Sequence, residues 1–175
     1  FGILQIDAHM DLRKAYQGLI YSHASIMYNA LKIPEISSIT QVGIRDFCQK
    51  EFSLSKTSSK VHSFTNQTLM NHQFEGLNWS KCCDTIINTC PQNIYISCDV
   101  DGLHPGLCPS TGTPLPGGLS YEAVVYLFEK VIQSGKKVIG FDLVETGAKT
   151  ALDAITSAKL LQNLCSVTSR SQLTT

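Results

Sequence analysis

Apolar and polar residues follow two different periods along the chain, and the two alternate. Four short, mostly apolar segments have the length of buried strands: 1–6, 39–44, 93–98 and 137–143. Four further segments carry apolar residues at helical spacing: 25–32, 79–89, 121–134 and 151–165. Pro34 would end the first of these helices, Ser120 would cap the start of the third, and Gly135 would end it. Strands and helices are therefore predicted to alternate through most of the chain.

Three segments have no clear period and are predicted to be irregular. Residues 53–68 are rich in Ser and Thr, which indicates a surface loop, with 61–64 as a candidate edge strand. Residues 102–118 are rich in Gly and Pro and predict a long loop after the third strand. The last ten residues are polar and are expected to fray.

This alternation is typical of an α/β fold in which helices cover both faces of a mostly parallel sheet, giving three layers. Ligands of such sheets bind beyond the carboxyl ends of the strands. Five acidic residues fall at or just past predicted strand ends: Asp7, Asp46, Asp99, Asp101 and Glu145. The pattern therefore places the candidate chemistry at one edge of the sheet.

The composition limits the class of protein. The 175 residues are 43% hydrophobic, with a mean hydropathy of +0.03, which is enough apolar material for a packed core. Fourteen basic residues balance fourteen acidic ones, and this balance argues against binding to nucleic acid or to an anionic membrane. Charged residues make up only 16%, so we expect a partner subunit or further chain to cover part of the surface.

Cysteine usage and the N-terminus bear on the location and extent of the chain. Seven cysteines without a C-x-x-C pair fit neither a zinc ribbon nor a disulfide framework, and they favour a reducing cytoplasm. No run of eighteen apolar residues predicts a membrane span. The chain opens at Phe1 directly into a strand-like run, which we interpret as a start within a fold.

Two short motifs at strand ends carry the candidate chemistry: Asp7-Ala8-His9-Met10-Asp11 and Asp99-Val100-Asp101. Alternate residues of an extended chain point to the same side, so the polar groups of each motif would project together. A single aspartate at a strand end is often only a cap or turn residue. Four carboxylates at one sheet edge, however, would repel one another unless protons or cations compensate. Oxygen ligands with an imidazole suit Mn²⁺, with Zn²⁺, Fe²⁺ or Co²⁺ as alternatives.

In order and spacing, these motifs resemble the ureohydrolases, the family of arginase, agmatinase and formimidoylglutamase. The resemblance runs from Gly2 to about Leu164 and includes further segments: Leu12-Arg13, Ser22-His23, Gly102-Leu103 and Thr111-Gly112-Thr113-Pro114. It implies an arginase-like three-layer α/β/α fold. Residues 1–175 would be a partial single domain, the C-terminal portion without the N-terminal strands. The resemblance also implies a homo-oligomer, a trimer or hexamer, in the cytoplasm.

The resemblance implies two Mn²⁺ ions in each active site. Asp7 and Asp99 would each bridge both ions. His9 and Asp101 would complete the second ion's ligands, and Asp11 would bind the first. The family's first ion takes another histidine from an upstream G-G-D-H motif, which this sequence does not contain. One of the two sites is therefore expected to lack a ligand within these residues.

The implied reaction is hydrolysis of a linear amidine, a guanidino or formimino compound, by attack of a metal-bridging hydroxide on the amidino carbon. Asp11 would pass a proton to the departing amine. Glu145 would pair with the cationic amidino group, and His23 would shuttle protons or contact the substrate. Thr113 belongs to a T-G-T-P turn near the metals. For Glu145, His23 and Thr113, the simpler alternatives are an exposed loop residue, a helix cap and a turn residue.

Departures from the family pattern bear on the substrate. Arg45-Asp46 is followed by Phe47-Cys48, so the aspartate with which arginases bind the α-amino group is missing, and arginine is disfavoured. Arg13 could bind a substrate carboxylate, as in a formimidoylglutamase, or form a structural ion pair. Tyr21-Ser22-His23 resembles agmatinases, whose substrate is cationic at both ends. His104 replaces an aspartate of the family, so the role of that position in shaping its loop is in doubt.

Two alternatives to a working hydrolase stay open. The chain alone could be a catalytically incomplete fragment or pseudoenzyme, because the upstream histidine is missing. It could also be a metal-binding or assembly subunit without turnover. In the favoured reading the partner is a small guanidino or formimino molecule, with neither nucleic acid nor membrane involved.

Overall fold

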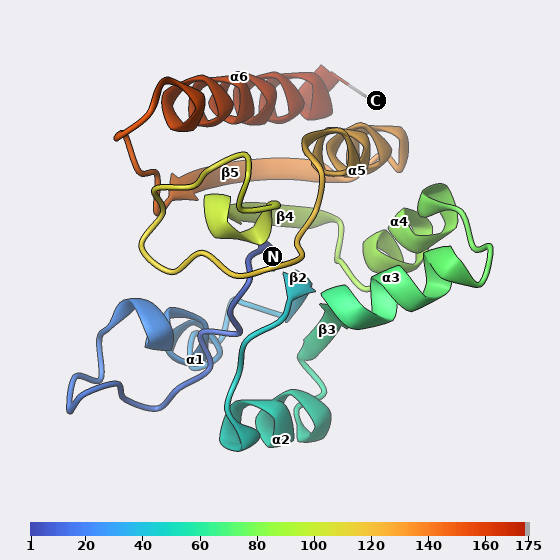
Figure 1. The fold of residues 1–175 in the computed structure, drawn as a ribbon. Helices are drawn as coiled ribbons and strands as arrows, with labels where there is room; N and C mark the ends of the chain where they lie inside the picture. The colour runs from blue at the N-terminus through green and yellow to red at the C-terminus, as the bar shows by residue number, and fades with distance from the viewer. Residues whose placement is uncertain (174–175) are drawn as a thin grey trace.

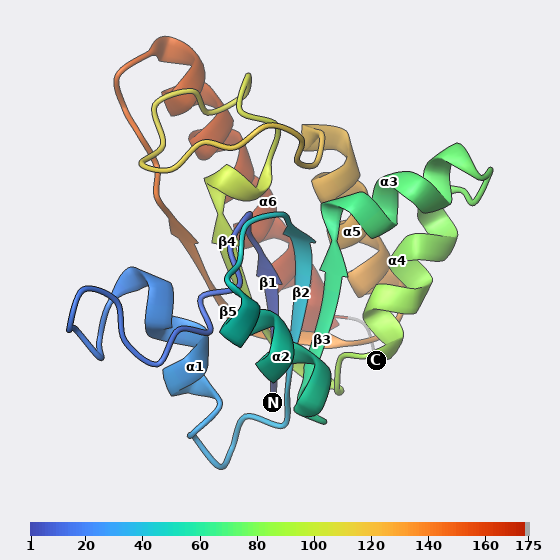
Figure 2. The same cartoon turned by 60° about the horizontal axis from the view of Figure 1, so that its bottom comes forward.

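The computed structural model describes residues 1–173 and contains a parallel sheet with strand order β3-β2-β1-β4-β5. The strands are β1 (Gly2–Ile6), β2 (Ser38–Ile44), β3 (Val61–Thr65), β4 (Asn93–Asp99) and β5 (Lys137–Val144). Each neighbouring pair is parallel, and the arrowheads of β1, β2 and β3 point the same way in Figure 2. The carboxyl ends of the strands therefore meet at one edge of the sheet, as the sequence predicts.

Helices cover both faces of the sheet, which confirms the predicted three-layer α/β/α architecture (Figure 1). One face carries α3 (Asn66–Phe74), α4 (Trp79–Asn88), α5 (Tyr121–Gln133) and α6 (Ala151–Leu173). The other carries α1 (Ile26–Ala30) and α2 (Gln49–Thr57). Two short 3-10 helices complete the order, η1 (His23–Ser25) before α1 and η2 (Val100–Gly102) after β4.

Alternation along β1 divides its buried side chains between two cores. Leu4 and Ile6 pack with α4, α5 and α6 in the larger core. Ile3 packs on the opposite face with Met27 of α1 and Ile39 of β2. The central strand is thus covered on both faces, which explains why its sequence reads as a continuous apolar run.

The predicted surface loop at 53–68 is wrong for most of its length, because α2 and α3 occupy its two ends. Only the edge strand, β3, lies where the sequence places it. Both helices begin at local caps: Glu51 Oε2 accepts from the N–H of Cys48 at 2.9 Å, and Thr65 Oγ1 accepts from the N–H of Thr68 at 3.1 Å. Polar residues of this segment cap helices. The apolar residues of both helices follow only a weak period, so the sequence pattern does not reveal the helices.

The C-terminal helix extends further than predicted. Residues 166–173, expected to fray, continue α6. Ser171 Oγ accepts from the N–H of Val138 at 3.0 Å, and Gln172 Nε2 donates to the Val138 carbonyl at 2.8 Å, so this end of α6 is bound to β5. The remaining part of that prediction, residues 174–175, lies outside the described residues. No helix within 1–173 combines the length and apolar character needed to cross a membrane.

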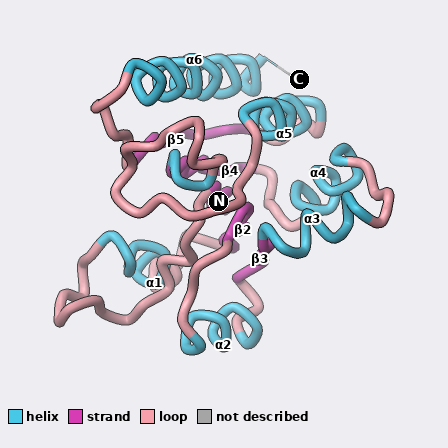
Figure 3. The backbone as a smooth tube through the Cα atoms, viewed as in Figure 1, coloured by secondary structure: helices cyan, strands magenta, loops and turns pink. Residues whose placement is uncertain are grey.

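The Gly/Pro-rich segment after β4 is a long loop, as predicted, and Figure 3 draws it mostly in pink between β4 and α5. It is held by Arg45, which follows β2. The Arg45 guanidinium donates to backbone carbonyls of six residues: Gly43, Asp101, Gly102, Leu103, Leu115 and Pro116. This one side chain therefore fixes both ends of the loop beside the carboxyl ends of β1 and β2.

Candidate metal centre and substrate pocket

A cavity of about 410 Å³ lies at the carboxyl ends of the strands. Its lining residues are Asp7, His9, Asp11, Arg13, Tyr16, His23, Ala24, Asp46, Glu51, Asp99, Asp101, Gly112, Thr113 and Glu145. All nine residues that the sequence nominates for metal or substrate contacts are among them. The fold thus gathers the nominated residues from segments after β1, β4 and β5 into one pocket, while their individual roles stay predictions.

The first motif begins where β1 ends. Asp7 is buried, and both of its carboxylate oxygens accept hydrogen bonds: Oδ1 from the N–H of His9 at 2.6 Å and Oδ2 from Nε2 of Gln5 at 2.7 Å. Asp11 has a φ of 53°, a left-handed conformation that is uncommon outside glycine. The sequence argument assumes that the motif is extended throughout, and this assumption fails at Asp11. Asp11 nevertheless lines the pocket.

The second motif connects β4 to β1. Asp99 Oδ1 accepts from the N–H of Asp101 at 2.8 Å, and Asp101 Oδ1 accepts from the N–H of Ala8 at 3.0 Å. Gly102 lies against β1 so closely that a Cβ there would be 2.7 Å from the nitrogen of Asp7. Only glycine fits this approach. The two motifs are consequently fixed relative to each other by backbone contacts.

His9 lies between carboxylates of both motifs. Its Nδ1 is 3.0 Å from Asp101 Oδ2 and 3.5 Å from Asp7 Oδ1, and its Nε2 is 4.0 Å from Asp46 Oδ2. The hydrogen bonds with Asp101 and then Asp7 raise the pKa of His9 to about 10. Burial opposes ionisation of Asp101, but hydrogen bonds with His9 and the N–H of Ala8 outweigh it, and the pKa of Asp101 is lowered.

The other carboxyl groups are crowded enough to retain protons. Burial, followed by the charges of Asp7 and Asp101, raises the pKa of Asp99 to about 10. Burial, followed by the charge of Asp7, raises the pKa of Asp11 to about 8. The pKa of Asp7 rises to about 6, again mainly through burial. A cation bound among these carboxylates would offset their mutual repulsion and favour their ionised forms.

The donor set fits a divalent metal ion. Asp7, His9 and Asp101 each offer one ligand atom, and these atoms lie within 4.8 Å of one another. Asp11 and Asp99 lie outside that tight group but line the same cavity. Carboxylate oxygens with one imidazole suit a hard or borderline ion such as Mn²⁺.

The three predicted substrate contacts other than Arg13 are exposed, and each lines the pocket. Thr113 Oγ1 donates to Asp101 Oδ2 at 3.2 Å, so this threonine reaches a predicted metal ligand. The ring of His23 meets Tyr16 edge-on, with 5.5 Å between centroids. Glu145 has a φ of 57°, a second left-handed residue in the pocket. Asp11 and Glu145, two of the three left-handed residues other than glycine in the described chain, thus line this cavity.

Arg13 lines the pocket and also forms the ion pair that the sequence leaves open as an alternative. Its Nε is 3.4 Å from Glu51 Oε2, and its guanidinium lies 5.2 Å from the ring centroid of Tyr16. Glu51 is only 3% exposed, and its Oε1 accepts from the N–H of Leu12 at 3.1 Å. Sequence reasoning missed Glu51 and Tyr16. The available signal for Glu51 was its spacing of three residues from Cys48, which is the spacing of a capping box.

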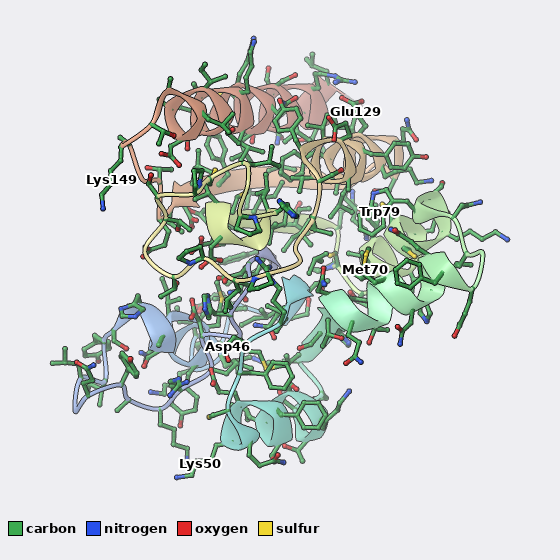
Figure 4. All side chains as sticks on the ribbon, in the orientation of Figure 1. Asp46, Lys50, Met70, Trp79, Glu129 and Lys149 are labelled. Carbon is green, nitrogen blue, oxygen red and sulfur yellow. The ribbon has the colours of Figure 1, made fainter. Side chains whose placement is uncertain are left out.

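Two further positions occupy the surface near the site. Asp46, labelled in Figure 4 between β2 and α2, lines the pocket with a side chain that is 58% exposed. His104 is exposed, and its Nδ1 accepts from the N–H of Gly106 at 3.0 Å. The histidine therefore shapes the start of the loop after β4 and does not line the pocket.

Comparison with known proteins places this geometry in context. A sequence model of the Arginase family matches residues 1–167. The chain is 41% identical over 162 residues to the N(1)-aminopropylagmatine ureohydrolase of Thermus thermophilus, covering 92% of this chain and 52% of that protein. It is 32% identical over 165 residues to the agmatinase of Pyrococcus horikoshii, covering 89% and 51%.

The fold gives the same answer. The solved structure of proclavaminate amidinohydrolase from Streptomyces clavuligerus superposes with a TM-score of 0.79 at 25% identity, covering 98% of this chain and 56% of that one. The chain spans about half the length of the curated relatives it matches. With a family match along nearly its whole length and the same arrangement of strands and helices, the chain belongs to the arginase family.

Proposed function

We propose that the protein to which this chain belongs hydrolyses a linear guanidine of the agmatine class with the help of divalent metal. The observation that carries the proposal is the composition of the pocket. His9 is held between Asp7 and Asp101, and Asp11 and Asp99 face the same cavity. Amidino carbons react slowly with neutral water, so a site of this kind needs the activation that metal ions provide.

Five residues would hold the metal, for which we favour Mn²⁺: Asp7, His9, Asp11, Asp99 and Asp101. When bound, such ions acidify water and balance the charge of the surrounding carboxylates. The hydrogen bonds from Gln5 and from the His9 backbone would keep the Asp7 carboxylate in one orientation. The backbone and side-chain bonds at the ends of β1 and β4 would therefore hold the ligands in place.

Asp11 is suited to move the proton during the reaction. Its carboxyl group lines the same cavity as the other four proposed ligands, so it would lie beside the water and the departing amine. Asp11 would take a proton from the attacking water and deliver it to the departing amine. His23, exposed at the pocket, would exchange protons with solvent.

Glu145 and Thr113 would orient the substrate. Glu145 would pair with the guanidinium, and its left-handed backbone fixes the direction from which the carboxylate enters the pocket. Thr113 already donates to Asp101, so its methyl and hydroxyl groups border the space next to the metal ligands. Together they would hold the amidino carbon near the site of attack.

The charge of the pocket favours a cationic substrate over an acidic one. Seven carboxyl groups line it: Asp7, Asp11, Asp46, Glu51, Asp99, Asp101 and Glu145. The one arginine in the lining, Arg13, is paired with Glu51, so its positive charge is already balanced within the pocket. A guanidine with a distal amine fits this pocket better than formiminoglutamate does. The relatives named above, an N(1)-aminopropylagmatine ureohydrolase and an agmatinase, support the same choice.

The test is a substrate panel with Mn²⁺ added. Agmatine, N(1)-aminopropylagmatine, arginine and formiminoglutamate would be supplied in turn, and the release of urea from the guanidines or of formamide from formiminoglutamate would be measured. Urea release from one of the first two, lost in Asp99→Asn, is the expected result. Turnover of formiminoglutamate with neither cationic guanidine hydrolysed would overturn the substrate class, and no turnover of any compound would overturn the proposal.

We also propose a homo-oligomer in the cytoplasm. The low content of charged residues supports this, because a covered surface needs fewer of them. Light scattering on the purified protein would test it, and a monomer at micromolar concentration would contradict it.

A further inference from the structure

A chain of buried side-chain hydrogen bonds crosses three strands and ends on Asp7. Ser63 Oγ of β3 donates to Gln41 Oε1 of β2 at 2.7 Å. Gln41 Nε2 donates to Gln5 Oε1 of β1 at 2.7 Å, and Gln5 Nε2 donates to Asp7 Oδ2 at 2.7 Å. The three partners are directly opposite one another in the sheet register, Gln5 with Gln41 and Gln41 with Ser63.

The direction of this chain is fixed. Each glutamine oxygen accepts from the preceding member, and each amide nitrogen uses both of its donors. The second donor of Gln41 goes to the carbonyl of Met10 at 2.7 Å, and that of Gln5 goes to the carbonyl of His9 at 3.3 Å. Reversing Gln5 would set its amide nitrogen against that of Gln41, and reversing Gln41 would set its oxygen against Gln5 Oε1 and the Met10 carbonyl. The chain therefore presents a hydrogen-bond donor, and only a donor, to the carboxylate of Asp7.

The two glutamines occupy buried positions of the sheet where an apolar side chain would cost less free energy to bury. Gln5 and Gln41 are both 0% exposed, on the face where their strand neighbours Ile3 and Ile39 form a hydrophobic core. Burying an amide in such surroundings is unfavourable unless every polar atom is paired. Here every one is paired, and the pairs lead to the site and nowhere else.

We propose that Gln5, Gln41 and Ser63 are positioning residues for the metal centre, a role that rests on the metal dependence of the proposed function. They hold Asp7 as a carboxylate acceptor in one rotamer. Through the carbonyls of His9 and Met10 they also fix the backbone that leads into the left-handed turn at Asp11. These hydrogen bonds thus set the geometry of the ligands that follow β1, starting from a residue two strands away.

The test compares near-isosteric variants that break this chain of hydrogen bonds with one variant that removes an unrelated hydrogen bond. Gln5→Met and Gln41→Met delete the amides, and Ser63→Ala deletes the first donor. The control is Thr40→Val. Thr40 is also 0% exposed on β2, but its hydroxyl bonds Thr89 at 2.8 Å and contacts nothing in the site.

The measured quantity is the dissociation constant for Mn²⁺, from calorimetry or from the spin-resonance signal of free Mn²⁺. Gln5→Met should weaken binding on the order of tenfold or more, as loss of a group that holds a metal ligand does. Gln41→Met should weaken it less and Ser63→Ala least, because they act through Gln5. Thr40→Val should stay within about twofold, because the Thr40 hydroxyl bonds Thr89 and takes no part in the hydrogen-bond chain to Asp7.

The outcomes separate this inference from the function on which it rests. If the unaltered protein binds no Mn²⁺, the proposed function fails. If it binds Mn²⁺ and Gln5→Met binds equally well, only the positioning role fails. A metal-free readout covers both cases: Ser63→Ala should shift the side-chain amide resonances of Gln41 and Gln5, and Thr40→Val should not. Unchanged resonances in Ser63→Ala would overturn the continuous chain.

Discussion

The guanidinium of Arg45 donates to the backbone carbonyl of Asp101 at 2.6 Å across 56 residues of sequence. The same side chain reaches Leu103 at 3.2 Å and Leu115 at 3.1 Å. Because Arg45 lies directly after β2, its planar guanidinium can donate to several backbone carbonyls at once. Arg45 therefore anchors both ends of the loop after β4, and one of these contacts is the backbone of a proposed metal ligand, Asp101.

Arg45→Lys should lower the free energy of unfolding by about 2–3 kcal/mol, because an ammonium cannot satisfy the same set of carbonyls and leaves several without a donor. Urea denaturation followed by circular dichroism would measure this. Arg170→Lys, at the exposed ion pair with Glu129, is the matched control and should lower the free energy of unfolding much less. Equal losses in the two variants would argue against the anchoring role.

Asp99→Asn should weaken Mn²⁺ binding strongly and abolish turnover, because it removes one of the carboxylates that would hold the metal. Metal content after dialysis and urea release would be measured together. Asp84→Asn, which breaks the surface pair with Lys130, should leave both unchanged. Normal Mn²⁺ occupancy in Asp99→Asn would count against the assignment of Asp99 as a ligand.

Asp11→Asn should lower kcat more than it raises KM, since the carboxyl group is assigned to proton transfer and an amide cannot carry the proton. A loss of two to four orders of magnitude in kcat is the expected scale for a general acid–base group. Steady-state kinetics at saturating Mn²⁺ would measure it. An effect confined to KM would move Asp11 from proton transfer to substrate binding.

Arg13→Met should leave kcat/KM for a cationic guanidine within about fivefold of the unaltered value, because it removes a partly exposed ion pair with Glu51 and no substrate contact. Kinetics with agmatine or N(1)-aminopropylagmatine would test this. A loss of a hundredfold or more would mean that Arg13 contacts the substrate directly, contrary to the proposed pocket chemistry.

The metal-free protein should lose stability as the pH rises from about 6.5 to 10. His9 keeps its proton up to a pKa of about 10 in the folded chain, whereas an unfolded histidine loses it near 6.5. Asp99, with a pKa raised to about 10, retains its proton over the same range. The folded state binds more protons than the unfolded state, so the free energy of unfolding falls with pH.

Urea midpoints at pH 6.5 and pH 9 in the presence of a chelator would measure that dependence. His9→Gln should reduce the dependence without abolishing it, because the variant has no imidazole to hold a proton while Asp99 keeps its own. A midpoint that is equal or higher at pH 9 in the unaltered protein would contradict the assigned proton occupancy.

The sequence predicted the fold where apolar period and chain geometry agree. The run ending at Asp7 and the run ending at Cys98 became neighbouring strands, and their motifs met at one edge. It failed where local capping decides structure: α2 begins through Glu51 and Cys48, which no hydrophobic pattern marks. Side-chain partners were also out of reach, because the register that pairs Gln5 with Gln41 exists only once the sheet has formed.

The bond from the N–H of Ala8 to Asp101 Oδ1 closes a loop of 93 residues. Parallel strands so far apart in sequence pair slowly, because the entropy of closing the intervening chain is lost before their contacts form. The metal ligands of β1 and β4 therefore come together only when the central strands have paired. Because these ligands meet only in the completed fold, Mn²⁺ would bind the folded state in preference to its precursors and stabilise it by mass action, so the folded fraction would rise with the supply of Mn²⁺.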